Sequence, residues 1–175
     1  VIDNIINGDQ EAFRELVEKY KVMVYSLCCK ILQNNEDAEE VSQDVFVKVF
    51  LSLKSYRKES KLSTWIYRIA YNTAISKSRK KKYTQEYIGD KDLNEFASGD
   101  NELDEKEQIN KALKQLYPNE RGIIMMYYFE DFSVKEIAEI SGLGLSNVKI
   151  TLHRTRLKLK AILESTLKKE LQWMI

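Results

Sequence analysis

The stretch FSVKEIAEISGLGLSNVKITLHRTRLKLKAIL, residues 132–163, decides the fold of the C-terminal part of this chain. It predicts two helices joined by the four-residue turn SGLG at 141–144, because glycine and serine interrupt the helical period there. Ser133 and Glu136 have the spacing of a capping box for the first helix, and Ser146 is placed to cap the second. A short glycine turn before a basic helix is typical of a helix-turn-helix, which places its second helix in the DNA major groove.

The second of these helices has two distinct faces. Its core-facing stripe, at helical spacing, consists of Val148, Leu152, Thr155, Leu159 and Ile162. The opposite face carries Lys149, Ile150, His153, Arg154 and Leu157, flanked by Arg156, Lys158 and Lys160. A run of charges is most often only a solvated face. The two caps, the glycine turn and the outward apolar Ile150 favour DNA binding over that interpretation.

Composition and charge describe a helical chain with two basic parts. With 175 residues, 43% hydrophobic and 31% charged, the chain has room for one ordinary domain or two small ones. A single proline and pervasive helical periodicity predict an all-α fold. The net charge of +1 conceals segregation: cations cluster at 77–82 and in the last helix, and acids concentrate at 90–107.

Breaks in periodicity divide the chain into two small helical domains. Asp9 is placed to cap a first helix, Asn34-Asn35 interrupts it, and a second helix runs from Glu36 to about Ser55. After a loop at 56–63, Ser63 is placed to cap a third helix that ends near residue 82. These boundaries predict a helical bundle over 1–83, a flexible acidic linker over 84–103, and a helix-turn-helix domain over 104–175.

The third helix of the bundle offers a possible second nucleic-acid surface. Trp65 belongs to its core stripe, and the opposite face interleaves aromatic and polar or basic residues: Tyr67, Arg68, Tyr71, Asn72, Ile75 and Arg79. Such a face suits single-stranded nucleic acid, because rings stack on unpaired bases while cations follow phosphates. Tyrosines are equally common where they cover neighbouring helices. The residues alone leave these two alternatives even.

Other chemistry finds little support in the sequence. The lone His153 has no matched acid and nucleophile, two cysteines with one histidine do not fit a zinc site, and there is no glycine-rich phosphate loop. An enzyme or a cofactor-binding protein is therefore not expected. Cys28 and Cys29 are interpreted as reduced core thiols of a cytosolic protein, and no signal peptide or transmembrane segment is visible. The segment VFVKVFL, 45–51, is apolar nearly all round, which predicts that it is either buried on both sides or packed against another protein.

Three segments together resemble one known family. They are DAEEVSQDVFVKVF (37–50), YRKESKLSTWIYRIAYNTAISKSRK (56–80) and LYPNERGIIMMYYFEDFSVKEIAEISGLGLSNVKITLHRTRLKLK (116–160). In this order they resemble the extracytoplasmic-function (group 4) sigma factors of bacterial RNA polymerase, which belong to the sigma-70 family. The resemblance implies a promoter-specificity subunit that recognises the −35 and −10 elements and helps to melt the promoter.

The resemblance also implies a role for each segment. Contact with the β′ clamp helices of core polymerase falls on Glu40, Gln43, Asp44, Val47 and Lys48. Capture and melting of the −10 element fall on Lys58, Ser60, Lys61, Thr64, Tyr67, Arg68, Tyr71 and Asn72. Recognition of the −35 element falls on Lys149, Ile150, His153 and Arg154, with phosphate contacts from Ser146, Asn147 and Arg156.

The implied partners are core polymerase, through the β′ clamp helices and the β flap, and promoter DNA, both as duplex and as the melted non-template strand. The family is commonly held inactive by an anti-sigma factor, often at the membrane, and otherwise acts on the nucleoid in the cytoplasm. No small-molecule substrate is implied. The alternative is a stand-alone helix-turn-helix regulator whose N-terminal bundle senses a signal or dimerises.

Overall fold

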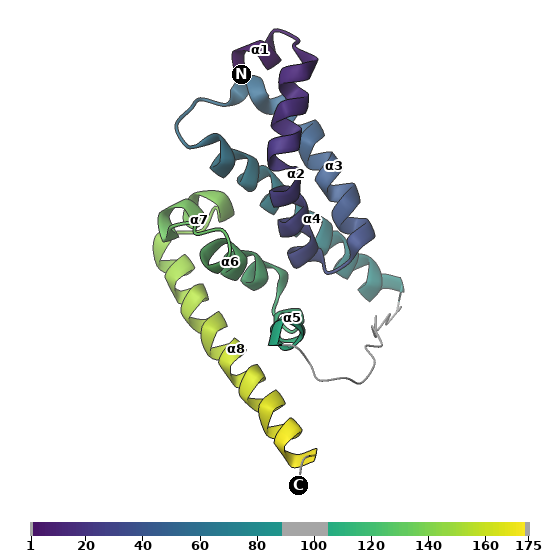
Figure 1. The fold of residues 1–175 in the computed structure, drawn as a ribbon, viewed down its shortest axis with the longest axis vertical. Coiled ribbons are helices and arrows are strands. Elements are labelled where there is room, and N and C mark those ends of the chain that lie inside the picture. Colours follow the sequence, from purple (N-terminus) through teal and green to yellow (C-terminus); the bar gives the residue numbers. More distant parts are fainter. Residues whose placement is uncertain (1, 89–104, 174–175) are drawn as a thin grey trace.

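The structure is a computed structural model that describes residues 2–88 and 105–173, with side chains described over 2–82 and 108–165 (Figure 1). Within these ranges the regular elements are all helical, as the all-α prediction requires. Most of the predicted acidic linker, 89–103, lies outside the described residues. The described part of the chain contains no helix long and apolar enough to cross a membrane.

The N-terminal half is a bundle of α1 (Ile2–Ile6), α2 (Gln10–Leu32), α3 (Asn35–Ser52) and α4 (Leu62–Ile88), with a 3-10 turn at Leu53–Ser55. Asp9 caps α2 by accepting a hydrogen bond from the Ala12 amide at 3.0 Å, as predicted. Asn34 caps α3 in the same way through the Asp37 amide at 2.8 Å. The two caps satisfy amides that have no partner within their helices, and thereby fix where α2 and α3 begin.

The C-terminal half consists of α5 (Glu105–Lys114), α6 (Pro118–Tyr128), α7 (Val134–Ser141) and α8 (Leu145–Trp173). The predicted capping box of α7 is present: Ser133 Oγ accepts from the Glu136 amide, and Glu136 Oε2 accepts from the Ser133 amide. Gly142 ends α7 in the left-handed region with φ 72°, a conformation that glycine adopts without strain. Helices α7 and α8 therefore form the predicted helix-turn-helix, and α8 packs against α5, α6 and α7 before its C-terminal end projects beyond them (Figure 1).

Three predicted boundaries were wrong by a few residues. Helix α8 begins at Leu145, where Gly144 accepts the first hydrogen bond from the Val148 amide, so Ser146 lies inside the first turn and does not cap it. Helix α4 begins at Leu62, so Ser63 is likewise inside the helix. Helix α4 also continues to Ile88, which lies within the segment predicted as linker.

The two halves pack directly against each other. Helix α7 lies along α4 and helix α6 lies against α2, and buried residues of both halves form one continuous hydrophobic core (Figure 1). Tyr67 of α4 meets the ring of Phe132 edge-on at a centroid distance of 4.7 Å. Arg121 of α6 donates to the backbone oxygen of Ile31 in α2 at 2.6 Å. The interface therefore combines apolar contact with a buried, charged hydrogen bond. We call this packing the closed arrangement.

Candidate nucleic-acid and polymerase surfaces

Helix α8 presents its predicted DNA face to solvent. Val148, Leu152 and Thr155 are buried beneath it, as the helical stripe predicted, while Leu159 and Ile162 are half-buried. The seven candidate residues on the other side are all exposed: Ser146, Asn147, Lys149, Ile150, His153, Arg154 and Arg156. A core stripe and an opposite polar face on one rigid helix fix which side chains can enter a groove together.

Two cations of α8 are held by aromatic rings of α6 and of Tyr117, the residue just before it. The guanidinium of Arg156 lies 5.3 Å from the ring centre of Tyr127 and 5.4 Å from that of Tyr128. The ammonium of Lys158 lies 4.5 Å from the ring of Tyr117 and 3.0 Å from Glu120 Oε2. Cation–π contacts restrict long side chains without neutralising them. Arg156 is therefore oriented in advance at the edge of the α8 face.

The predicted single-strand face of α4 is divided between exposed and buried residues. Arg68 and Asn72 are exposed, whereas Tyr67 is 1% exposed, Tyr71 4% and Thr64 2%. The sequence left two roles for these tyrosines equally favoured, stacking on bases and covering neighbouring helices. In the closed arrangement both tyrosines cover helices of the C-terminal half. The sequence could not decide between the two, because periodicity cannot reveal a second set of helices that lies across the first.

Burial also changes the acidity of both phenols. It raises the pKa of Tyr71 to about 12. Burial, with a contribution from the Glu130 carboxylate, raises the pKa of Tyr67 well above its ordinary value. Both rings remain neutral at physiological pH, and the Tyr67 hydroxyl lies near the Glu130 carboxylate without a well-aligned hydrogen bond.

Two hollows lie on the surface beside α4, and the loop at 56–61 borders the smaller of them. One, of about 440 Å³, lies between α3 and α4 and includes Lys48, Trp65, Arg68 and Asn72. The other, of about 240 Å³, lies under the loop and is lined by Ser55, Tyr56, Arg57, Glu59, Ser60, Trp65, Arg68 and Glu139. Each has a tryptophan and an arginine in its wall, which suits an unstacked base and its phosphate.

Trp65 packs against the hydrophobic core, as its place on the core stripe predicts. It is half-buried, and it also contributes to both hollows. Tyr56 packs on it with ring centres 5.2 Å apart and donates its hydroxyl to the Ser60 backbone oxygen. Lys58 holds a left-handed backbone with φ 60°, which is uncommon for a residue other than glycine. These contacts hold the loop in one shape and place Ser60 in the wall of the smaller hollow.

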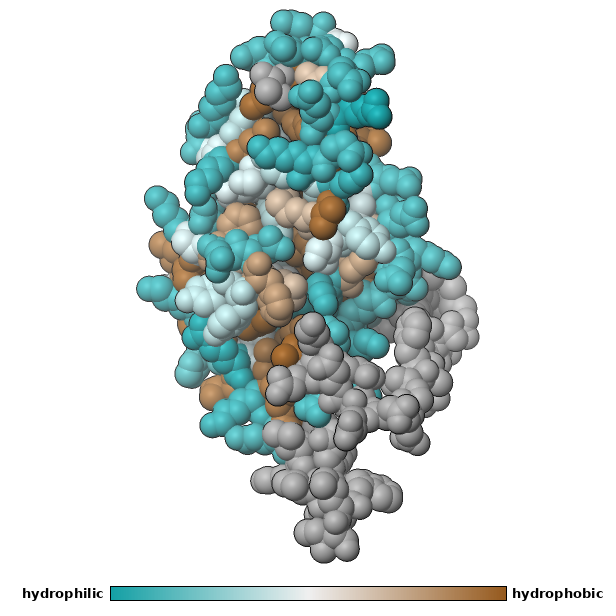
Figure 2. Space-filling model, in the orientation of Figure 1, coloured by the Kyte–Doolittle hydropathy of each residue, from teal (hydrophilic) through white to brown (hydrophobic). Residues whose placement is uncertain are grey.

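The predicted polymerase face lies along the outside of α3. Gln43, Asp44 and Lys48 are exposed, and Val47 is 57% exposed next to the large apolar side chains Phe50 and Leu51. The underlying stripe of Ala38, Val41, Val45 and Val49 is buried. The apolar segment 45–51 therefore has one buried side and one solvated side. Exposed apolar side chains also occur elsewhere on a largely hydrophilic surface (Figure 2). An exposed hydrophobic stripe such as that of Val47, Phe50 and Leu51 on α3 is typical of a protein-binding surface.

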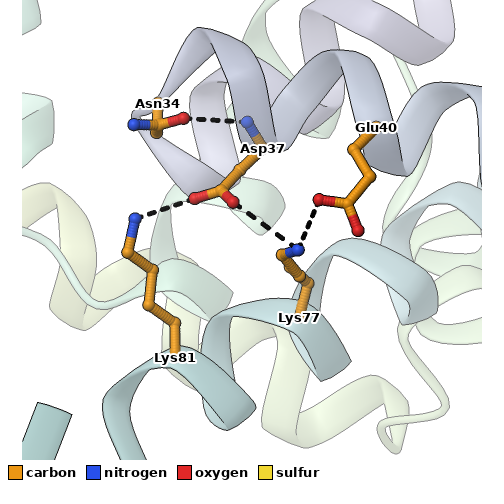
Figure 3. Close-up of polar contacts among 5 residues, drawn as sticks. All are labelled: Asn34, Asp37, Glu40, Lys77 and Lys81. Carbon is orange, nitrogen blue, oxygen red and sulfur yellow. Dashed lines mark hydrogen bonds and ion pairs between the residues drawn. The ribbon is translucent and has the colours of Figure 1, made fainter. Parts of the chain in front are cut away.

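A charge cluster fastens the start of α3 to the end of α4 (Figure 3). Asp37 pairs with Lys81 at 2.8 Å and with Lys77 at 3.6 Å, and Lys77 also pairs with Glu40 at 2.6 Å. Partial burial opposes ionisation of Asp37, but the bonds and charges of Lys81 and Lys77 hold its pKa below the usual range. Part of the predicted basic cluster is therefore engaged in structure, and Glu40 is a paired residue at the edge of the α3 face.

The remaining candidates from the sequence are the two cysteines and a possible metal site. Cys28 is buried and Cys29 half-buried, and burial raises the pKa of the Cys28 thiol to about 11, so it stays protonated. Among the described residues, no group of histidine, cysteine and carboxylate side chains has the geometry of a metal site.

Comparison with known proteins assigns the family. The Sigma-70 region 2 model matches residues 16–84, and the Sigma-70, region 4 model matches 106–159. The ECF RNA polymerase sigma factor SigW of Bacillus subtilis (strain 168) is 32% identical, with 89% of this chain and 90% of the relative covered. The RNA polymerase sigma factor YlaC of the same organism is 30% identical, with 86% and 91% covered.

Solved structures agree in fold. The sigma factor RpoE in its co-crystal structure with the anti-sigma factor NepR from Bartonella quintana matches with TM-score 0.69 and 21% identity, covering 88% of this chain and 98% of that one. CnrH in complex with the cytosolic domain of CnrY matches equally well, with TM-score 0.69, 21% identity and 94% and 95% covered.

Two helical units, the second a helix-turn-helix, are thus the architecture of a sigma factor rather than of a stand-alone regulator. The chain belongs to the extracytoplasmic-function sigma factors of the sigma-70 family.

Proposed function

We propose that this chain directs core RNA polymerase to promoters through three separate surfaces. The observation that carries the proposal is the exposed face of α8, where Lys149, Ile150, His153 and Arg154 project together above a buried stripe. Arginine and lysine suit the acceptor edge of guanine, and Ile150 suits a thymine methyl group. These four residues read the −35 element, while Ser146, Asn147 and Arg156 bind the flanking phosphates.

The loop at 56–61 and the adjacent face of α4 bind the melted −10 strand. Ser60, Arg68 and Asn72 line the hollows, and Lys58 and Lys61 are exposed on the same loop. Thr64, Tyr67 and Tyr71 join this surface when the closed arrangement opens. The role is that of a DNA-binding initiation factor and not of an enzyme.

The third surface is the α3 face, which we assign to the β′ clamp helices of polymerase. Its exposed apolar residues supply contact area, and Gln43, Asp44 and Lys48 supply polar complementarity at the rim. Glu40 lies at its edge, and the β flap is the expected partner of the C-terminal half. An anti-sigma factor is a further expected partner, by likeness to RpoE and CnrH in their complexes. The expected place of action is the cytoplasmic nucleoid, with retention at the membrane by that partner.

Run-off transcription on genomic DNA fragments, with core polymerase and this protein, tests the function directly. Arg154→Glu is expected to reduce specific transcripts at least tenfold, since a lost bidentate base contact is worth about 1–3 kcal/mol. Lys160→Glu is the matched control, because it reverses an exposed cation on the same helix outside the candidate face. Polymerase association is expected to persist in both variants. Full-strength transcripts from Arg154→Glu would refute the assigned −35 role. An equal loss of transcripts in both variants would indicate only general electrostatic attraction to DNA.

A further inference from the structure

A cavity of about 400 Å³ lies between the end of α2 and helices α5 and α6. Both halves supply its wall, with Cys29 and Lys30 from α2, Lys114 from α5 and Arg121 from α6. A volume of this size fits a small ligand. The described residues that line it include none of those assigned to DNA or to polymerase. The proposed function therefore leaves this cavity without a role.

The wall of the cavity is positively charged. Lys30, Lys114 and Arg121 line it, and the lining residues within the described ranges include no carboxylate. Lys30 donates from Nζ to Asn110 Oδ1 at 3.1 Å, so this lysine is joined to α5 through a neutral amide. Asn110 and Asn35 add their side-chain amides to the wall. Because ammonium, guanidinium and amide groups all donate hydrogen bonds, the cavity is rich in donors for anionic oxygen atoms.

The carbonyl groups at two helix ends balance Arg121 but not Lys30. Arg121 is 6% exposed and donates to the Ile31 oxygen in the last turn of α2 at 2.6 Å. It also donates to the Leu116 oxygen at 2.6 Å and to the Lys114 oxygen at 3.4 Å, both at the end of α5. Each helix C-terminus carries about half a negative charge, so the two ends together offset about one cation. The Lys30 ammonium is additional to this balance and attracts an anion.

The buried guanidinium of Arg121 also has a donor without an acceptor. Its Nε is buried and has no hydrogen-bond partner among the described residues. Burial lowers the pKa of Arg121 to about 10, against an opposing effect of the Glu120 charge, so the group stays protonated at neutral pH. Buried polar groups are rarely left unpaired, because the lost hydrogen bond costs free energy. This part of the wall therefore lacks an acceptor that the oxygen of a ligand can supply.

We propose that this cavity binds a small, multiply charged anion, a polycarboxylate or a phosphate compound, between α2, α5 and α6. Lys30 binds one acidic group, Arg121 attracts another, and the amides of Asn35 and Asn110 donate to the remaining oxygen atoms. The site shares no residue with the proposed DNA and polymerase surfaces, so it does not depend on them. Because both halves form the wall, a bound anion stabilises their contact by an amount that grows with its concentration relative to Kd.

Cys29 reports whether the cavity is occupied. Its thiol is half-buried in the wall, whereas Cys28 is buried and has a pKa raised by burial to about 11, so Cys29 is the thiol that reacts in the folded chain. Iodoacetamide is a suitable reagent because it is neutral, and mass spectrometry measures the rate of alkylation. Citrate and inorganic pyrophosphate are the probes. Sodium chloride keeps the ionic strength equal in all samples, so that general screening does not change between them.

At least one probe is expected to slow the alkylation of Cys29 at least threefold, with a saturable dependence on its concentration, because a bound molecule covers the thiol. Protection by citrate alone assigns a carboxylate ligand, protection by pyrophosphate alone assigns a phosphate ligand, and protection by both assigns a site for either group. The proposal is overturned if neither probe protects Cys29 or if protection does not saturate. This part of the test uses the wild-type chain and needs no variant.

A pair of lysine variants tests the assigned contact. Lys30→Gln removes the charge but keeps a side chain that can bond to Asn110, and it is expected to weaken binding of the probe at least fivefold. Lys19→Gln is the matched control, because it makes the same change on an exposed residue of the same helix, away from the cavity. Its affinity is expected to equal that of the wild type. Equal losses in the two variants would mean only general attraction to positive charge and would overturn the proposal.

Discussion

Asp37 is expected to stabilise the N-terminal bundle by about 2 kcal/mol at neutral pH. Its side chain is 17% exposed, pairs with Lys81 and Lys77, and lies in the first turn of α3 (Figure 3). Each partly exposed ion pair contributes roughly 0.5–1 kcal/mol, and an acid at a helix N-terminus contributes about 0.5 kcal/mol more. Asp37→Asn keeps the shape of the side chain and removes all three contributions.

Urea unfolding followed by circular dichroism measures this difference. For a slope of about 2 kcal/mol per molar urea, the midpoint is expected to fall by about 1 M. Asp44→Asn is the control, because it makes the same exchange on an exposed residue of the same helix, and its midpoint is expected to stay at the wild-type value. In about 1 M salt the Asp37→Asn effect is expected to shrink, since the Debye length falls to about 3 Å.

The pH dependence of the stability difference tests whether it comes from the charge of Asp37. Because Lys81 and Lys77 lower the pKa of Asp37 in the folded chain, its stabilisation is present above the unfolded value of about 3.9. The stabilisation is lost as pH falls through the lower, folded value. The gap between wild type and Asp37→Asn is therefore expected to be full from pH 7 to about 5 and to close below about pH 4. A gap that is absent at pH 7, or that persists unchanged in strong acid, would refute the assignment to charge.

Three further substitutions test other contacts. Ser133→Ala removes one half of the α7 capping box and is expected to lower the free energy of unfolding of the C-terminal half by about 1 kcal/mol, which thermal denaturation measures. Arg121→Met leaves the Leu116 and Ile31 oxygens unpaired and is expected to cost about 3 kcal/mol in urea; an unchanged midpoint would contradict it. Asp44→Arg is expected to weaken binding to core polymerase about tenfold in a fluorescence-anisotropy titration, and unchanged affinity would argue against the α3 face.

Local patterns in the sequence determined much of the fold and one of the surfaces. Asp9 before α2, and Ser133 with Glu136 before α7, cap their helices as predicted, because capping depends on side chains within three residues. The outward face of α8 also followed from the sequence, since a helix with one strong core stripe leaves its other side to solvent. The family resemblance was confirmed by the matching models.

Only the tertiary structure decided what happens to the face of α4. Tyr67 and Tyr71 have the same periodicity whether they meet solvent, DNA or another helix, so the sequence alone left the choice even. Trp65 packs against the core as its helical spacing predicts, and only the structure shows that it also forms a wall of both hollows.

Gly122 is another position whose packing the sequence does not reveal. In the sequence it is a weak point in a helix, whereas in the structure it is the place where α6 comes within contact of Tyr71 and Ile31. Helix formation and capping are governed by neighbours along the chain, and these the sequence contains directly. Which surface covers which depends on residues nearly a hundred positions apart, such as Ile31 and Arg121, and that pairing exists only once the two halves have packed.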